Sequence, residues 1–185
     1  TVAAASLLTG CGGGSKDSSK NDDIAVVSRE DGSGTRGAFV ELFGVEEEKD
    51  GKKVDMTTQS AQITNSTSVM MTTIAENDAA IGYISLGSLN DTVKAVKIDG
   101  AEASAENVKN GSYKVVRPFN IVTKDGLSDA AKDFQSFIMS KEGQKVVEDN
   151  GYISVDENAK AFKSNGAKGK VVVSGSSSVT PVMEK

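Results

Sequence analysis

The chain has 185 residues, of which 37% are hydrophobic and 5% aromatic, so it can bury one modest core, and its formal net charge is −5. This acidic balance disfavours nucleic acid as a partner. The absence of histidine excludes a Ser-His-Asp triad and any metal site with histidine ligands, and the single cysteine allows no internal disulfide. These counts favour a globular binding domain, for which we expect no cofactor and no metal.

The first 23 residues carry a motif for lipid attachment. Residues 1–10 are mostly small and apolar, and Leu8-Thr9-Gly10-Cys11 has the spacing of a bacterial lipobox, which predicts a shortened signal peptide followed by a lipidated Cys11. Residues 11–23, rich in Gly, Ser, Lys and Asp, are predicted to form a flexible linker. No apolar run approaches the roughly 18 residues that a transmembrane helix needs. We therefore expect a lipid-anchored protein on the extracellular face of the cell membrane.

Residues 24–124 alternate short β-branched runs with helical patterns, which is typical of an α/β fold. The expected strands are 24–28, 78–85, 93–98 and 112–124, the last one interrupted by Pro118, and the expected helices are 35–43, 65–77 and 103–109. Residues 54–60 are predicted to form a polar connection. In the helix at 65–77, which Asn65 or Ser66 would cap, the predicted core positions are Val69, Met70, Thr73 and Ile74.

The remaining residues predict two helices, a linker and one further strand. Ser128 and Ser140 are suited to cap helices at 128–139 and 141–149, and Asn150-Gly151 supplies a left-handed stop. Residues 156–169 are polar with scattered glycines and are predicted to be a linker. The apolar run Val171 to Val173 predicts a buried strand, and Pro181 marks the start of a helix.

The loop Arg29-Glu30-Asp31-Gly32-Ser33-Gly34-Thr35 has the composition of an oxyanion site. It lies between a predicted strand and the start of a predicted helix, whose positive end favours an anion. Arg29 would offer a planar fork of donors, Ser33 and Thr35 their hydroxyls, and Gly34 a backbone N–H. Asp31 is expected to orient Arg29, or to accept a proton from the bound anion, whereas Glu30 is expected to face solvent.

A second segment near the end of the chain repeats this pattern. After the run at 171–173 come Gly175 and three consecutive serines, Ser176, Ser177 and Ser178. Two such loops predict two walls of one site, in which neutral hydroxyl and amide donors surround a fully ionised anion. The alternatives are an ordinary Gly/Ser loop for the first segment and a serine-rich linker for the second.

These two loops, together with Ala80-Ile-Gly-Tyr-Ile-Ser85, resemble the family of phosphate-binding lipoproteins that serve phosphate-specific ABC transporters, in its Gram-positive form. The resemblance covers nearly the whole chain. It implies an α/β fold of the type II periplasmic-binding-protein kind, a monomer, and a permease and an ATPase as partners that receive inorganic phosphate. It assigns the phosphate contacts to the following residues: Arg29, Asp31, Ser33, Gly34, Thr35, Ser176, Ser177 and Ser178.

The order of the segments departs from the family pattern. In the family the Gly-Ser-Ser-Ser segment precedes the Arg29-type loop, and much of the first lobe separates the two. We therefore expect one mostly complete lobe at 24–124, helices at 125–155 that pack on a partial first lobe, and at 170–185 the start of a first-lobe or second-copy segment. This order predicts a piece of a tandem binding protein or a gene with an internal deletion, and a natural circular permutation is disfavoured.

Three other functions remain open at the level of sequence. In the first, the chain binds sulfate, molybdate or another tetrahedral oxyanion in place of phosphate. In the second, the chain is a surface fragment that binds nothing. An enzyme with a serine nucleophile would need a lysine base, and no Ser-x-x-Lys spacing occurs in either loop. A binding protein without catalytic residues is therefore favoured.

Overall fold

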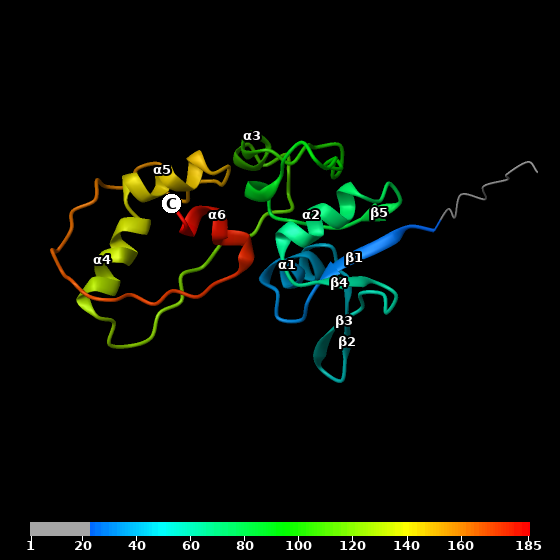
Figure 1. The fold of residues 1–185 in the computed structure, drawn as a ribbon, viewed down its shortest axis with the longest axis horizontal. Coiled ribbons are helices and arrows are strands. Elements are labelled where there is room, and N and C mark those ends of the chain that lie inside the picture. Colours follow the sequence, from blue (N-terminus) through cyan, green and yellow to red (C-terminus); the bar gives the residue numbers. More distant parts are fainter. Residues whose placement is uncertain (1–22) are drawn as a thin grey trace, which may run out of the picture.

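The computed structural model describes residues 23–185, and the motif around Cys11 lies outside this range. Figure 1 shows the arrangement of its elements. In chain order they are β1 (Ala25–Arg29), α1 (Gly34–Leu42), β2 (Glu46–Lys49), β3 (Lys52–Asp55), β4 (Gln62–Thr64), α2 (Thr67–Ala75), β5 (Ala80–Ile81), the short 3₁₀ helix η1 (Leu86–Ser88), α3 (Ala105–Lys109), α4 (Asp129–Ile138), α5 (Lys141–Asp149), the 3₁₀ helix η2 (Ser177–Val179) and α6 (Thr180–Met183).

A parallel three-stranded sheet organises the first half of the chain. Its strand order is β4-β1-β5, with Val27 opposite Gln62 and Ala25 opposite Ala80. Parallel neighbours require a crossover connection, and α1 and α2 lie in the two connections that join these strands. Since α2 contacts all three strands, it forms the main cover of the sheet. The predicted strand at 24–28 and the predicted helices at 35–43 and 65–77 are confirmed.

The best-buried side chains lie where α2 meets the sheet. Val27 of β1 and Met70 of α2 are each 1% exposed. A Cβ at Gly82 would come within 2.5 Å of Met70 Sδ, so this position needs glycine for the close approach of backbone and side chain. The prediction of Met70 as core is confirmed. Val69 is 44% exposed, so its predicted core position is wrong, and Met71 is buried instead because the helix turns that side toward the sheet.

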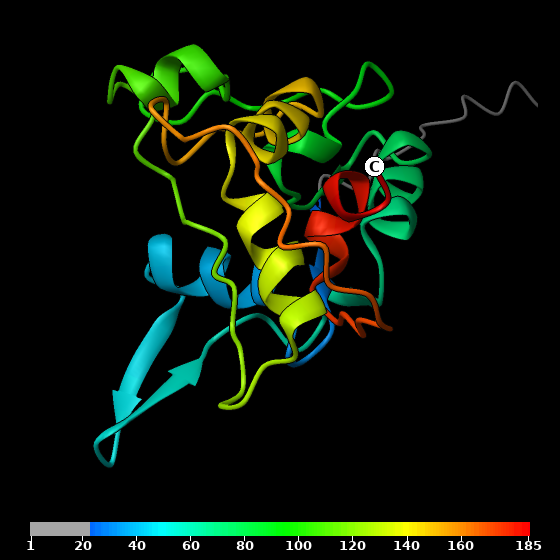
Figure 2. The same ribbon diagram turned by 90° about the vertical axis from the view of Figure 1, so that its left-hand side faces the viewer.

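An antiparallel hairpin, β2–β3, extends away from the body of the molecule, as Figure 2 shows. Asp50 and Gly51 form its turn, both with positive φ. The sequence prediction of a polar connection starting at residue 54 missed the end of β3. Nearly all side chains of the two strands are exposed, so they lack the alternation of apolar and polar residues by which a half-buried strand is recognised.

Helices α4 and α5 form as predicted. The hydroxyl of Ser128 accepts the N–H of Ala131 at 3.2 Å, and the hydroxyl of Ser140 accepts the N–H of Gly143 at 3.2 Å. These bonds satisfy amides that have no partner within the first turn of a helix. Just beyond α5, Gly151 adopts a φ of 79°, the left-handed stop expected from Asn150-Gly151.

The segment 156–169, expected to be a linker, contains no helix or strand but is held against α4 and α5. Phe162 packs edge-on against Phe137, with ring centroids 5.2 Å apart. Asp133 of α4 accepts the hydroxyl of Ser164 and the N–H of Asn165, each at 2.7 Å. A polar composition therefore corresponds here to a covering segment with specific hydrogen bonds.

Three predicted strands are absent from the described residues: 93–98, 112–124 and the run 171–173. Ile98 makes only an isolated bridge to Ala101, and Val172 is 82% exposed. A β-branched composition favours extended backbone, but a strand needs a partner for its N–H and C=O groups. Residues 23–185 supply none at these three places.

The C-terminal residues lie between the two halves of the molecule. In Figures 1 and 2, η2 and α6 sit between the α4–α5 pair and the half that contains the sheet. Pro181 lies in the first turn of α6, as the sequence predicted. Among the described residues, no helix is long and apolar enough to pass through a bilayer.

Replacing Gly87 of η1 by alanine is expected to destabilise the fold, because a Cβ there would lie 2.1 Å from the ring of Tyr152. Overpacking of this kind costs about 1–3 kcal/mol. Gly37, inside α1, is the matched control: a Cβ there meets nothing within 4 Å, and Gly→Ala inside a helix stabilises by about 1 kcal/mol. Urea unfolding of the two variants should shift in opposite directions, and an unchanged free energy of unfolding for Gly87→Ala would contradict the packing described.

Candidate functional site

The Arg29 loop connects the end of β1 to the start of α1. Arg29 is the last residue of β1, and Ser33 is the N-cap of α1, with its hydroxyl accepting the N–H of Arg36 at 3.4 Å. Gly32 makes the turn possible with a φ of 81°. Gly34 begins the helix, and a Cβ there would lie 3.8 Å from Ser176 Oγ. The predicted strand, loop and helix are therefore present, and the second loop reaches the start of this helix.

Arg29 is buried, with 3% of its surface exposed, and each of the three nitrogens of its guanidinium donates at least one hydrogen bond. Nε donates to Glu30 Oε2 at 2.8 Å and Nη2 donates to Glu30 Oε1 at 3.0 Å. Nη2 also donates to Ser177 Oγ at 3.1 Å, and Nη1 to Thr67 Oγ1 at 3.4 Å. One edge of the guanidinium is thus occupied by a carboxylate, and its outer end faces two hydroxyls.

Glu30 and Asp31 exchange the roles that the sequence analysis assigned to them. Glu30, expected to face solvent, pairs with Arg29, and the hydrogen bond from Arg29 lowers the pKa of the Glu30 carboxyl below its usual value. Asp31, expected to orient Arg29, has a side chain 96% exposed and pairs with Arg36 at 2.8 Å. The reason is geometric: the turn at Gly32 directs the Asp31 side chain outward, whereas the adjacent Glu30 can reach both Nε and Nη2.

Arg36 links the Arg29 loop to the β2–β3 hairpin by hydrogen bonds. Nη1 donates to the carbonyl of Arg29 at 2.9 Å, and Nε donates to Asp55 Oδ2 at 2.7 Å. Burial raises the pKa of the Asp55 carboxyl, but the hydrogen bonds from Thr57 and Arg36 outweigh burial, and the net shift is downward. The end of β1 is therefore connected through Arg36 to the base of the β2–β3 hairpin.

The three serines lie beside the Arg29 loop. Ser178 is 1% exposed, and its hydroxyl shares a short hydrogen bond with the hydroxyl of Thr35. Ser177 contacts Arg29 although the two residues are 148 positions apart in the chain. The hydroxyl of Ser176 caps η2 by accepting the N–H of Ser178 at 3.2 Å. Two segments far apart in sequence thus meet at one cluster of donors.

The structure adds four residues that the sequence analysis did not assign to the site. The hydroxyl of Tyr152 and, at 3.5 Å, that of Ser85 donate to the carbonyl of Ser178. Tyr83 contacts the end of β1, and Thr67, in the first turn of α2, lies 3.5 Å from Ser177 Oγ. Tyr83 and Ser85 belong to the segment that contributed to the family resemblance. Thr67 and Tyr152 had no local signal, since only the packing of α2 and of the segment after α5 brings them near.

This cluster has the chemistry of an oxyanion site. It combines a buried guanidinium, several hydroxyls and the first turns of α1 and α2, whose positive ends favour an anion. No buried side-chain nitrogen or oxygen among residues 23–185 lacks a hydrogen-bond partner, so a ligand would exchange with contacts such as Thr35–Ser178. In the same range, no group of three or more His, Cys, Asp or Glu side chains is placed to hold a metal.

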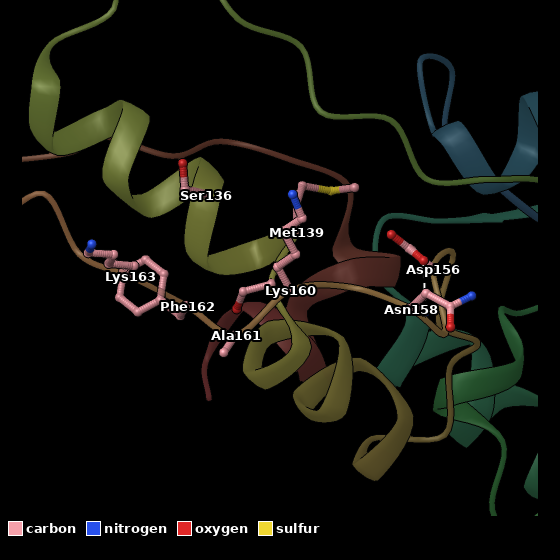
Figure 3. Close-up of a pocket in the computed structure, with 9 residues that line it drawn as sticks. Ser136, Met139, Asp156, Asn158, Lys160, Ala161, Phe162 and Lys163 are labelled. Atoms are coloured by element: carbon pink, nitrogen blue, oxygen red, sulfur yellow. Dashed lines mark hydrogen bonds between the residues drawn. The ribbon is translucent and has the colours of Figure 1, made fainter.

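The hollow drawn in Figure 3 lies elsewhere, on α4 and the covering segment. It has a volume of about 350 Å³ and opens to solvent. Its lining residues are Ser136, Met139, Ser140, Asp156, Asn158, Lys160, Ala161, Phe162 and Lys163. None of them belongs to the Arg29 cluster, so this hollow is not part of the candidate site.

Proteins similar over nearly the whole chain are phosphate-binding proteins. "Phosphate-binding protein PstS 2" of Streptococcus agalactiae serotype V is 60% identical over 181 residues, which cover 97% of this chain and 61% of the relative. The protein of the same name from Streptococcus pneumoniae serotype 4 is 47% identical and covers 100% of this chain and 66% of the relative. The chain therefore spans about three fifths to two thirds of the length of these curated relatives.

The alignment with the S. agalactiae protein also bears on the order of the two loops in the chain. Since 97% of the chain is matched over 181 aligned residues, the alignment has almost no gaps. The order in which the Arg29 loop precedes the Gly-Ser-Ser-Ser segment is consequently shared with that relative. The expectation of a tandem piece or an internal deletion stays a prediction.

Solved structures agree with the sequence comparison. A phosphate-binding protein of a phosphate ABC transporter from S. pneumoniae TIGR4 matches with a TM-score of 0.71 and 48% identity, over 87% of this chain and 63% of that one. A putative phosphate ABC transporter substrate-binding protein from Clostridium perfringens, solved with bound phosphate, matches with a TM-score of 0.64 and 46% identity, over 72% of this chain and 52% of that one.

These matches confirm the fold expected from sequence, an α/β fold of the type II periplasmic-binding-protein kind. The expectation of one mostly complete lobe and one partial lobe stays a prediction. The family model described as "PBP superfamily domain" matches residues 15–142, which is more than half of the chain. The chain belongs to the PBP superfamily.

Proposed function

We propose that this chain contributes a phosphate-binding site to a protein that captures inorganic phosphate outside the cell membrane and delivers it to an ABC importer. The observation that carries the proposal is the meeting of the Arg29 loop and the Ser176–Ser178 segment at one buried cluster of donors. Relatives named for phosphate binding, and a neighbour solved with phosphate, support the choice of ligand. Seven of the eight contacts predicted from sequence are proposed to touch the anion: Arg29, Ser33, Gly34, Thr35, Ser176, Ser177 and Ser178. The eighth, Asp31, is proposed to act on the loop through Arg36.

The energetics favour this arrangement for an anion that has lost its water. A desolvated phosphate must recover its hydration energy from charge-assisted hydrogen bonds. The outer end of the Arg29 guanidinium faces Thr67 and Ser177, and hydroxyls can turn from one another to a ligand oxygen. Because the protein is acidic overall, local dipoles and this one buried cation would hold the anion. Asp31 would act on the loop through Arg36 and not by touching the anion, given its exposed side chain.

The attachment and the partners belong to the same proposal. A lipidated Cys11 would hold the protein at the outer face of the membrane, with residues 11–23 as tether. The permease and ATPase of the importer would receive the anion from a monomeric binding protein. Binding would occur without turnover, because within residues 23–185 the hydroxyls of Ser177 and Ser178 contact Arg29 and Thr35, neither of which is a general base.

Isothermal titration of the chain with phosphate and then with sulfate tests the proposal, since the chain has no tryptophan to report binding by fluorescence. Phosphate is expected to give a saturable heat of binding, and sulfate is expected not to displace the bound phosphate. Equal heat with sulfate or molybdate would favour another oxyanion as the ligand. No heat with any of the three would contradict the proposal and favour a surface fragment that binds nothing.

Arg29→Lys is expected to weaken phosphate binding while it keeps the positive charge, because the ammonium group cannot reproduce the planar fork. Loss of a hydrogen bond to a charged group costs about 1.5–3 kcal/mol, so the Kd should rise roughly 10- to 150-fold. Arg117→Lys is the control, since Arg117 pairs at the surface with Glu41. An unchanged Kd for Arg29→Lys would remove Arg29 from the site.

Ser177→Ala tests the second wall. Removing its hydroxyl takes one neutral donor from the site, which is worth about 0.5–1.5 kcal/mol, so the Kd should rise roughly 2- to 12-fold. Ser174→Ala is the matched control, because Ser174 lies just before the Ser176–Ser178 segment and is exposed. If the two variants bind phosphate equally well, the Ser176–Ser178 segment is not a wall of the site.

A further inference from the structure

The parallel hydrogen-bond ladder of β1 ends before the backbone N–H of Arg29, the last residue of the strand, is paired. Along a strand in a parallel sheet, successive N–H groups point alternately to the two neighbours. The N–H of Glu30 bonds the carbonyl of Thr64 after β4, at 3.0 Å, and the N–H of Ala25 bonds the carbonyl of Ala79 on the β5 side, at 2.9 Å. By this alternation the N–H of Arg29 points to the β5 side, where β5 has already ended at Ile81.

The side chain of Tyr83 takes the place of the missing strand. Its hydroxyl accepts the N–H of Arg29 at 3.1 Å, and the same hydroxyl is 2.7 Å from Ser28 Oγ. Ser28 is 1% exposed and Arg29 is 3% exposed, so water cannot easily replace either bond. One tyrosine hydroxyl therefore satisfies two buried polar groups at the residue pair from which the anion loop begins.

The ring of Tyr83 contacts the other side of the loop. It stacks on Phe39 with centroids 4.2 Å apart and an interplanar angle of 9°. Phe39 lies on α1, the helix that starts at Gly34 directly after the loop. Tyr83 thus holds the end of β1 by its hydroxyl and α1 by its ring.

We propose that Tyr83 is a positioning residue of the anion site, which fixes the backbone of Arg29 relative to the start of α1. This rests on the proposed function, because the site is the same one. A fixed backbone at Arg29 means that the guanidinium is already directed at Thr67 and Ser177 before the anion arrives. Pre-ordering of this kind raises affinity by reducing the entropy that binding costs.

Tyr83→Phe separates the hydroxyl from the ring, since it retains the stack on Phe39 and removes only the bond to Arg29 and Ser28. Amide hydrogen exchange of the whole chain should show faster exchange at Arg29 than in the wild type. The amide of Val27, two positions earlier on the same strand, should accelerate less. By titration, the phosphate Kd should rise roughly 2- to 12-fold, the range expected when a long side chain must be ordered on binding.

Tyr113→Phe is the matched control. Tyr113 follows α3, where its own N–H donates to the carbonyl of Asn107, and within residues 23–185 its hydroxyl forms no hydrogen bond to the site. It should leave both the exchange of Arg29 and the Kd unchanged. Equal acceleration of Arg29 and Val27 in Tyr83→Phe would indicate a general loss of stability and would overturn the proposal. So would a wild-type Kd in Tyr83→Phe. If the wild-type chain itself does not bind phosphate, the proposed function fails, and the exchange of Arg29 still decides whether Tyr83 positions it.

Discussion

The burial of the Arg29 guanidinium is the constraint on which the candidate site depends. A cation with 3% of its surface exposed must have its charge balanced and its N–H groups satisfied inside the protein. Glu30 supplies the charge, and Ser177 and Thr67 supply acceptors. These three partners come from the loop itself, from the last described segment and from the start of α2. One buried side chain therefore accounts for the convergence of segments that are distant in the sequence.

The same constraint explains why the C-terminal segment docks. Its serines bring hydroxyls to Arg29 and Thr35, and the carbonyl of Ser178 is held in turn by Tyr152. Tyr152 closes against Gly87, where a side chain would leave it no room. The result is a continuous series of contacts from the sheet through the site to the residues after α5. Mutations at either end of this series are expected to change the geometry of the Arg29 cluster between them.

Much of the fold was predictable because its signals are local. Ser128 and Ser140 cap their helices as expected, and of the two candidates Asn65 and Ser66 it is Ser66 that caps α2. Gly151 ends α5. Such signals are local, since a cap involves only atoms within a few residues of it. The failures are non-local. Val171 to Val173 have the composition of a strand, but composition cannot supply a neighbouring strand. Glu30 and Asp31 are adjacent carboxylates, and which of them reaches Arg29 depends on the direction that the turn at Gly32 gives to each side chain.

By itself the sequence determined the α/β fold class, the helix caps and the residue types of an anion site, because each is encoded in short stretches whose chemistry is independent of distant contacts. Only the tertiary structure decided which side chains meet at the site. Glu30 pairs with Arg29, and Thr67 accepts a hydrogen bond from the same guanidinium. Tyr152 donates to the carbonyl of Ser178, and Tyr83 accepts the N–H of Arg29 at the end of β1. The physical reason is that hydrogen bonds form between groups that packing brings within about 3 Å. The packing of α2, β5 and the C-terminal segment around β1 sets those distances, and no local pattern records them.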